Sequence, residues 1–337
     1  MFAGTGSDVG KSLLAAAFCR IFRQDGYDPA PFKAQNMALN SYVTADGGEM
    51  GRAQVVQAEA AGVECHTDIN PLLLKPNTDK VCQVILNGRV VGNSSAAEFF
   101  RTGPGREALR REVCAAYDRL AARYNPVVLE GAGSISELNL RDADLVNMPM
   151  AAHAGADVFL VADIDRGGVF ASVYGTMQLL EAWERRLVKG IFINKFRGDI
   201  SLFDEGRRML EKLCGIPVLG VIPYLRDVHI EAEDSVALDR RHRRAEPGKV
   251  NIAVVLLRHL SNFTDFDTLE RRPGVCLYYT DSPEALDDAD IVFLPGSKSV
   301  MADLAELRRK GLADQIVRLA EAGRTVAGMC GGYQMMG

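Results

Sequence analysis

The chain has 337 residues, of which 47% are hydrophobic and 25% are charged, so it is too long for one ordinary compact domain and too apolar to be disordered. Its formal net charge of −5 provides no positive field for a nucleic-acid backbone, which argues against nucleic acid as a partner. No apolar run approaches the roughly 18 residues needed to span a bilayer, and the seven cysteines form no CxxC pair, so we expect a soluble cytoplasmic protein without a membrane contact, a disulfide framework or a structural zinc site.

A phosphate-binding loop is predicted near the start of the chain, after a strand remnant at residues 1–3. The loop reads GTGSDVGKS, and its small residues allow successive backbone N–H groups to turn towards phosphate oxygens. Lys11 adds a cation at the β/γ position, and Ser12 offers a hydroxyl to Mg²⁺. The helix predicted over KSLLAAAFCRIFRQ points its N-terminus at the anion. The predicted nucleotide-binding residues are consecutive in the chain: Gly4, Thr5, Gly6, Ser7, Asp8, Val9, Gly10, Lys11 and Ser12.

This loop departs from the common GxxxxGK[ST] motif. The spacing from Gly4 to Gly10 is one residue longer, and Thr5 stands where the first glycine would be. A glycine-rich turn with a surface lysine is the alternative interpretation, which the following helix disfavours. We expect that helix to bury one apolar face, made up of Leu14, Phe18, Ile21 and Phe22.

Short apolar runs alternate with helical patterns along the rest of the chain, as is typical of buried parallel strands. The predicted strands lie within the runs at 127–130, 158–165, 190–194, 218–224, 251–257, 275–279, 290–297 and 325–332, and one helix is expected over roughly 299–322. The charged segment 226–249 predicts a linker. The predicted fold is therefore α/β. It has a P-loop, doubly wound, mostly parallel sheet in residues 1–225 and the first part of a second, flavodoxin-like α/β domain in 250–337, and both chain ends look clipped.

Three polar residues follow predicted strands at positions where a nucleotide would bind. Lys33 would place a second cation near the transferred γ-phosphate, with a solvated surface lysine as the alternative. Glu130 opens the segment EGAGS and would hold Mg²⁺ beside the phosphates, unless it is an ordinary acid at a strand end. Asn194 precedes Lys195 and can read the adenine edge, because its amide carries a donor and an acceptor; a turn-forming asparagine is the alternative.

Candidate contacts for the acceptor substrate fall in two segments. Neutral side chains in PFKAQNMALNS can orient a carboxylate without holding it too tightly: Gln35, Asn36, Asn40 and Ser41. The segment DIDRGGVFAS follows a strand end, where open α/β sheets bind ligands, so Asp163 and Arg166 are predicted substrate residues. An ion pair of Arg166 with Asp163 or Asp165 is an equally good interpretation.

A G-x-C-x-G elbow, GMCGG, lies at residues 328–332 between a predicted strand and a helix. The tight turn would expose Cys330, the helix N-terminus would favour its thiolate, and the Gly331 N–H would donate to an oxyanion. PGS at 295–297 follows the preceding strand, so the backbone at Gly296 is the predicted second oxyanion donor. A buried structural cysteine is the alternative.

The longer phosphate loop resembles that of the family containing dethiobiotin synthetase and the cobyrinate amidases, in which ATP phosphorylates a carboxylate. Residues 31–41, 49–62, 70–79 and 83–89 sharpen this to a resemblance to the cobyric acid synthase family, and the Cys330 elbow is similar to that of class I glutaminases. The resemblance implies a ligase that uses ATP and Mg²⁺, with Glu49 as a third metal ligand. It also implies amidation of the b, d, e and g carboxylates of adenosylcobyrinic acid a,c-diamide through acyl phosphates, with ammonia from glutamine, to give cobyric acid.

Other interpretations remain open. A cobyrinate a,c-diamide synthase or another carboxylate amidase would share these motifs, whereas a partition-type ATPase switch would share the phosphate loop but not the elbow. The catalytic histidine of class I glutaminases follows the cysteine by a long stretch, and none of the five histidines matches that place; His259 fits a domain interface better. We therefore expect a nucleophile without its base in these 337 residues, and the sequence leaves the oligomeric state, including a homo-oligomer, open.

Overall fold

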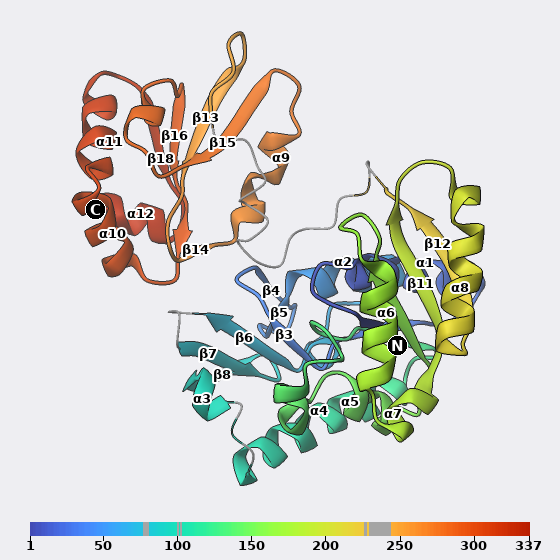
Figure 1. The fold of residues 1–337 in the computed structure, drawn as a ribbon. Helices are drawn as coiled ribbons and strands as arrows, with labels where there is room; N and C mark the ends of the chain where they lie inside the picture. Colours follow the sequence, from blue (N-terminus) through green and yellow to red (C-terminus); the bar gives the residue numbers. More distant parts are fainter. Residues whose placement is uncertain (77–80, 100, 102, 226–227, 229–243) are drawn as a thin grey trace. The chain divides into compact units, whose positions relative to one another are not determined.

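The computed structural model describes residues 1–76, 81–99, 101, 103–225, 228 and 244–337. They belong to two compact units (Figure 1). The first unit comprises Met1–Asn36, Tyr42–Leu74 and Gln83–Glu231, and the second comprises Met37–Ser41, Lys75–Cys82 and Ala232–Gly337. Most of the predicted linker at 226–249 lies outside the described residues, so its bounds stay a prediction.

The first unit is built on parallel strands. Its main sheet has the order β1-β10-β11-β12, formed by Phe2–Gly4, Val158–Asp163, Val188–Phe196 and Val218–Pro223. A second parallel pair joins β2 (Ala30–Phe32) to β9 (Val127–Leu129), and a parallel bridge between Phe2 and Glu130 connects this pair to β1. The carboxyl ends of these strands therefore lie along one edge, which is where α/β sheets bind ligands.

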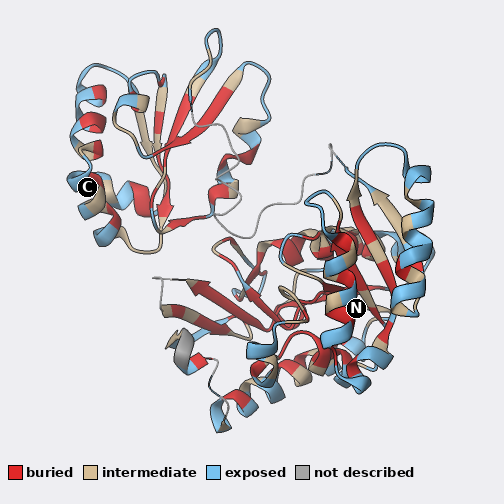
Figure 2. Ribbon diagram, in the orientation of Figure 1, coloured by how far each residue is buried: buried red, intermediate tan, exposed pale blue. Residues whose placement is uncertain are grey.

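Helices accompany the strands of the first unit, and Figure 2 shows that β1, β10 and β11 are largely buried. The bounds of the helices are α1 (Lys11–Gln24), α2 (Arg52–Ala61), α3 (Ala96–Phe99), α4 (Pro104–Ala121), α5 (Met148–His153), α6 (Val169–Leu179), α7 (Ala182–Leu187) and α8 (Asp204–Cys214). Among the residues that the structure describes, no helix combines the length and apolar character needed to cross a membrane.

The buried face of α1 differs from the prediction. Leu14 packs in the core and Phe18 and Phe22 pack against it, but Ile21 is 44% exposed, so its predicted place on that face is wrong. The buried stripe runs instead through Ala15 and Cys19, both fully buried. Small residues there allow α1 to pack closely against α2, and a pattern of large apolar residues does not reveal them.

Short strands that the sequence analysis did not predict form a further sheet. Its order is β3-β6-β7-β8, made of Gln35–Met37, Leu72–Pro76, Val81–Leu86 and Arg89–Ser95, and β4 (Ser41–Val43) pairs with β5 (Glu49–Gly51). Asn87 and Gly88 join β7 to β8 with φ values of 48° and 78°. Positive φ at both residues is typical of a two-residue hairpin turn, for which Asn-Gly is the strongest sequence signal.

The second unit also has a parallel sheet, with the order β15-β13-β16-β18. Its strands are Val275–Thr280, Val250–Val255, Ile291–Leu294 and Thr325–Gly328, and β14 (Leu260–Ser261) pairs antiparallel with β17 (Gly296–Ser297). Helices α10 (Val300–Arg309), α11 (Leu312–Glu321) and α12 (Gly331–Met336) gather beside β16 and β18, whereas α9 (Asp267–Glu270) lies beside β15 (Figure 1).

The α/β class and the strands predicted in both units are confirmed. The single helix predicted over 299–322 is wrong, because the chain breaks between α10 and α11. Gly311 has a φ of 76° there, a conformation that ends a helix and that glycine adopts without steric cost.

Candidate functional site

The predicted phosphate loop lies between β1 and α1, and close contacts leave no room for a Cβ at two of its glycines, Gly4 and Gly10. A Cβ at Gly10, where φ is 101°, would lie 2.0 Å from Nδ2 of Asn194. A Cβ at Gly4 would lie 2.7 Å from Nζ of Lys11. Lys11 is only 6% exposed, and its ammonium donates to the carbonyls of Gly6 and Gly133, each at 2.9 Å. The loop therefore holds a buried cation at the N-terminus of α1, as phosphate binding requires.

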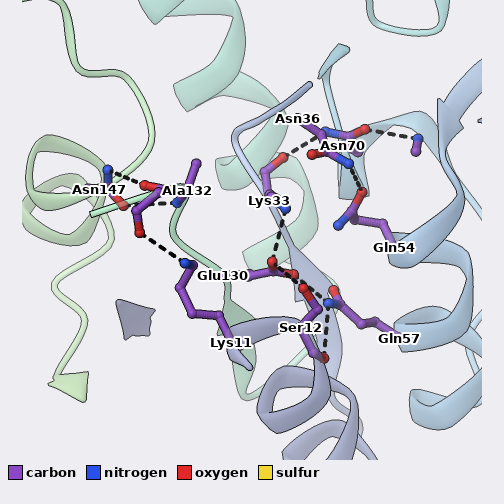
Figure 3. Close-up of polar contacts among 12 residues, drawn as sticks. Lys11, Ser12, Lys33, Asn36, Gln54, Gln57, Asn70, Glu130, Ala132 and Asn147 are labelled. Atoms are coloured by element: carbon purple, nitrogen blue, oxygen red, sulfur yellow. Dashed lines mark hydrogen bonds and ion pairs between the residues drawn. The ribbon is translucent and has the colours of Figure 1, made fainter. Parts of the chain in front are cut away.

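A buried carboxylate, that of Glu130, lies at the centre of the site beside this loop. It accepts hydrogen bonds from Ser12 Oγ at 2.8 Å, from Lys33 Nζ at 2.9 Å and from Gln57 Nε2 at 2.5 Å (Figure 3). Lys33 and Glu130 are 3% and 2% exposed, so the alternative of a solvated lysine is wrong, while the role of Glu130 as a metal ligand stays a prediction. The structure thus brings both Ser12 and Lys33 into direct contact with Glu130.

The charge state of Glu130 follows from these contacts. Burial alone would raise the pKa of Glu130, but the Lys33 ammonium and the hydrogen bonds from Gln57, Lys33 and Ser12 outweigh it and hold the pKa below its ordinary value. Glu130 is therefore an anion at neutral pH. Burial raises the pKa of the core thiol Cys19 to about 12, and the negative charge of Glu130 contributes to that rise.

Gln57, in α2, is a site residue that the sequence analysis missed. It is 1% exposed, it also donates to the carbonyl of Ser12 at 3.4 Å, and its Oε1 has no hydrogen-bond partner among the described residues. Gln54, one turn earlier, is fully buried as well. Two glutamines spaced three residues apart lie on one face of a helix, and this spacing was the signal for a polar site. A buried amide is costly unless it is hydrogen-bonded, so such a pair indicates polar partners nearby.

A second missed residue, Asn70, fixes the segments that carry Lys33 and Gln57. Its Nδ2 donates to the carbonyl of Lys33, and its Oδ1 accepts from the N–H of Gly51, both at 3.0 Å (Figure 3). Gly51 is the N-cap of α2. One side chain thus connects the lysine after β2 to the start of the helix that bears Gln57.

Asn147 performs a similar task for the segment after Glu130. It both accepts from the N–H and donates to the carbonyl of Ala132, each at 3.0 Å (Figure 3). A Cβ at Gly131 would lie 2.5 Å from its Oδ1, which explains a glycine next to Glu130. Because Gly133 supplies a carbonyl to Lys11, Asn147 helps to position the phosphate loop from outside it.

Asn194, the predicted adenine contact, lies within β11, so the turn-forming alternative is wrong. It is 2% exposed, and its Nδ2 donates to the carbonyl of Val9 at 2.8 Å. Asn194 therefore supports the phosphate loop directly, and its contact with adenine stays a prediction. Lys195 follows with a φ of 64°, and its ammonium contacts Asp163 Oδ2 at 2.8 Å and the Asp8 carbonyl.

The predicted substrate residues Asp163 and Arg166 are engaged in ion pairs. Nε of Arg166 lies 3.8 Å from Oδ2 of Asp163, and its NH2 lies 3.5 Å from Oδ2 of Asp8. Asp165 pairs with Arg197 instead, at 2.5 Å. The ion-pair interpretation of Arg166 is thus correct for Asp163 and wrong for Asp165, while a contact of Arg166 with substrate stays a prediction.

The other predicted acceptor contacts are largely buried. Asn36 is 2% exposed and donates to Oε1 of Gln54 at 2.9 Å, while Gln35 has a buried Oε1 with no partner among the described residues. Asn40 is buried, and Ser41 accepts from Nζ of Lys75 at 2.7 Å. Their contact with a substrate stays a prediction, as does the role of Glu49, in β5, as a third metal ligand.

Cys330, in the second unit, has the geometry of a nucleophile elbow. It is an exposed free thiol with a φ of 48°, so the alternative of a buried structural cysteine is wrong. A Cβ at Gly331 would lie 2.7 Å from the N of Ser297, and a Cβ at Gly332 would lie 1.9 Å from the carbonyl of Leu294. The two glycines that follow Cys330 thus allow the elbow to pack directly on the segment that contains the predicted oxyanion donor Gly296.

Three of the five histidines lie in described parts of the chain, and each contacts an aspartate. His66 contacts Asp68, His153 contacts Asp118, and His259 contacts Asp303 through Nδ1 at 2.7 Å. Within the described residues, Cys330 has no hydrogen bond to a histidine. The position of a base for Cys330, and a place of His259 at a domain interface, stay predictions. All seven cysteines are free thiols.

Comparisons with known proteins agree with both halves of this description. The family model of the CobQ/CobB/MinD/ParA nucleotide binding domain matches residues 1–236, and that of the CobB/CobQ-like glutamine amidotransferase domain matches residues 251–337. Cobyric acid synthase of Bacteroides fragilis is 70% identical over 337 residues, which are 100% of this chain and 68% of the relative. The proteins of that name from Phocaeicola vulgatus and Parabacteroides distasonis are 68% and 62% identical with the same coverage. The chain therefore belongs to the cobyric acid synthase family, whose nucleotide-binding and glutamine amidotransferase domains it carries in that order.

Proposed function

We propose that the chain catalyses the ATP-dependent amidation of carboxylates on a corrinoid, adenosylcobyrinic acid a,c-diamide, at positions b, d, e and g. The observation that carries this proposal is the contact of Glu130 with Ser12 and Lys33 beside the phosphate loop. Two ammonium groups, a hydroxyl and an ionised carboxylate there fit a triphosphate with its metal ion. The acceptor and the positions are those that the resemblance to the cobyric acid synthase family implies, and relatives of that name support a corrinoid acceptor.

The residues present fit MgATP. Ser12 and Glu130 offer two hard oxygen ligands in direct contact, which is the donor type that Mg²⁺ prefers, and the bound ion would neutralise charge on the phosphates. The glycine positions 4 and 10 leave no room for a Cβ, as expected of a backbone that closely surrounds phosphate oxygens. Asn194 supports this loop from β11 and is the proposed adenine contact.

The lysines stabilise the charge that is transferred. We assign Lys11 to the β- and γ-phosphate oxygens, which replace the carbonyls of Gly6 and Gly133 as acceptors of its hydrogen bonds. Glu130 accepts from the ammonium of Lys33, and Asn70 donates to its backbone carbonyl. The ammonium is therefore already oriented when substrate arrives. A preoriented cation stabilises developing charge without a reorganisation cost during the reaction.

The proposed reaction has two balanced steps. A carboxylate oxygen of the acceptor forms a bond to the γ-phosphorus while the bond from that phosphorus to the β,γ-bridging oxygen breaks, giving an acyl phosphate and ADP. Ammonia then attacks the acyl carbon, loses a proton, and displaces inorganic phosphate, leaving an amide. Cys330, at its elbow, is the proposed nucleophile that releases this ammonia from glutamine, with the backbone at Gly296 and Gly331 as oxyanion donors.

The acyl phosphate can be tested by isotope transfer. If the acceptor carboxylates carry oxygen-18, each amidation should move one labelled oxygen into inorganic phosphate, because the attacking carboxylate oxygen leaves with the phosphoryl group. Mass spectrometry of the released phosphate measures this. Amide formation with unlabelled phosphate would rule out the acyl phosphate, and ATP hydrolysis without any amide would favour a nucleotide switch instead.

A further inference from the structure

We propose that Asp303 is a positioning residue for glutamine hydrolysis, which acts by holding the predicted oxyanion segment Gly296–Ser297 against the Cys330 elbow. This inference rests on the proposed glutaminase function of Cys330. Asp303 lies in the first turn of α10 and is 2% exposed.

The carboxylate of Asp303 joins two segments that are far apart in the sequence. Its Oδ2 accepts from Ser297 Oγ at 2.6 Å, and its Oδ1 lies 2.7 Å from Nδ1 of His259. Ser297 Oγ in turn accepts from the N–H of Ser299, the N-cap of α10, at 2.9 Å. Both carboxylate oxygens therefore have a partner. Oδ2 holds Ser297, which lies in β17, and Oδ1 holds His259, which directly precedes β14.

Main-chain bonds tie the same two segments together. Leu260 pairs with Ser297 and Ser261 with Gly296, and the N–H of Lys298 donates to the carbonyl of His259 at 3.0 Å. A pair this short has few hydrogen bonds of its own, so it depends on side chains for rigidity. Asp303 supplies that second linkage from the helix that follows.

The position of this segment matters because the elbow packs on its backbone. A Cβ at Gly331 would lie 2.7 Å from the N and 3.1 Å from the O of Ser297, and a Cβ at Gly296 would lie 3.9 Å from Cβ of Cys330. An oxyanion donor acts only when it lies about 2.7–3.1 Å from the developing charge. Loosening the segment would therefore move a donor out of range without disturbing the thiol itself.

Both oxygens of Asp303 have a partner, one a hydroxyl and the other an imidazole nitrogen. An asparagine would not test these contacts, because its oxygen accepts from the hydroxyl and its NH2 group donates to the other imidazole tautomer. Asp303→Ala removes both linkages. Ser297→Ala removes the hydroxyl partner alone, and Ser297→Thr restores the hydroxyl. Glu306→Gln is the matched control, because Glu306 lies one turn further along α10 and pairs with exposed Arg309.

The test labels Cys330 with two reagents, in a form of the protein that uses glutamine, and follows the modified peptide by mass spectrometry. A diazoketone analogue of glutamine alkylates the thiolate with loss of nitrogen gas and places its ketone oxygen at the oxyanion donors, whereas iodoacetamide needs only the thiolate. We expect Asp303→Ala and Ser297→Ala to slow diazoketone labelling by about 10-fold or more, with an unchanged iodoacetamide rate. Ser297→Thr and Glu306→Gln should label at the rate of the unaltered chain.

Each other outcome overturns the inference. Unchanged diazoketone labelling in a folded Asp303→Ala variant would remove Asp303 from the site. Equal slowing with both reagents, together with a lower melting temperature, would assign Asp303 a merely structural role. If the diazoketone fails to label Cys330 in the unaltered chain, the proposed glutaminase function itself is overturned, and the role of Asp303 with it.

Discussion

Replacing Lys11 with alanine should lower the rate of ATP-dependent amidation by at least about 100-fold, the usual effect of removing one charged donor from a transition state. Lys11 is the cation of the phosphate loop, and its ammonium already lies among backbone carbonyls at the N-terminus of α1. The loss should appear in kcat as well as in kcat/KM, because negative charge shifts on the phosphates during transfer. Ammonia-dependent turnover measures the effect without the glutaminase.

Controls separate this effect from unfolding. The Gly6 and Gly133 carbonyls lose a donor in Lys11→Ala, at a cost of about 1–3 kcal/mol in the free energy of unfolding if they stay buried. Lys11→Met keeps the aliphatic stem, and circular dichroism shows whether each variant is folded. Lys189→Ala is the matched control, because Lys189 is exposed and donates to the carbonyl of Arg186. Near-normal turnover in a folded Lys11 variant would contradict the phosphate-loop assignment.

Replacing Cys330 with alanine should abolish glutamine-dependent amidation and leave ammonia-dependent amidation unchanged. The reason is chemical: without the thiol, no glutamyl thioester forms and no ammonia is released, whereas the synthetase site needs only ammonia. The measurement compares the two nitrogen sources in a form of the protein that uses glutamine.

Cys214→Ala is the control for the removal of a cysteine, since Cys214 is a free thiol at the C-terminus of α8. It should retain both activities. Glutamine-dependent turnover in Cys330→Ala would show that another residue is the nucleophile.

Much of the fold could be predicted because buried parallel strands are continuous apolar runs. The runs at 158–165 and 190–194 correspond to β10 and β11, and the phosphate loop is followed by α1 as expected. Predictions failed where small residues decide the outcome. Ala15 and Cys19, rather than Ile21, face the core. Gly311 divides the segment 299–322, for which a single helix was predicted.

The candidate site could be predicted in part, for a related reason. Lys33 and Glu130 follow strands β2 and β9, so parallel topology alone brings them to one edge, and the structure confirms that they are in contact. Gln57, Asn70 and Asn147 could not be assigned this way. Their partners are backbone groups or buried charges distant in the sequence, and only the tertiary structure shows which polar atoms need them.

The central claim is that the Glu130 site uses MgATP to amidate a corrinoid. The most direct measurement incubates the protein with adenosylcobyrinic acid a,c-diamide, MgATP and ammonium, and follows the corrinoid by mass spectrometry and ADP by chromatography. We predict four successive amide additions with one ADP formed for each. Amidation of cobyrinic acid at a and c instead, or ATP hydrolysis and nucleotide-dependent dimerisation with an unchanged corrinoid, would contradict it.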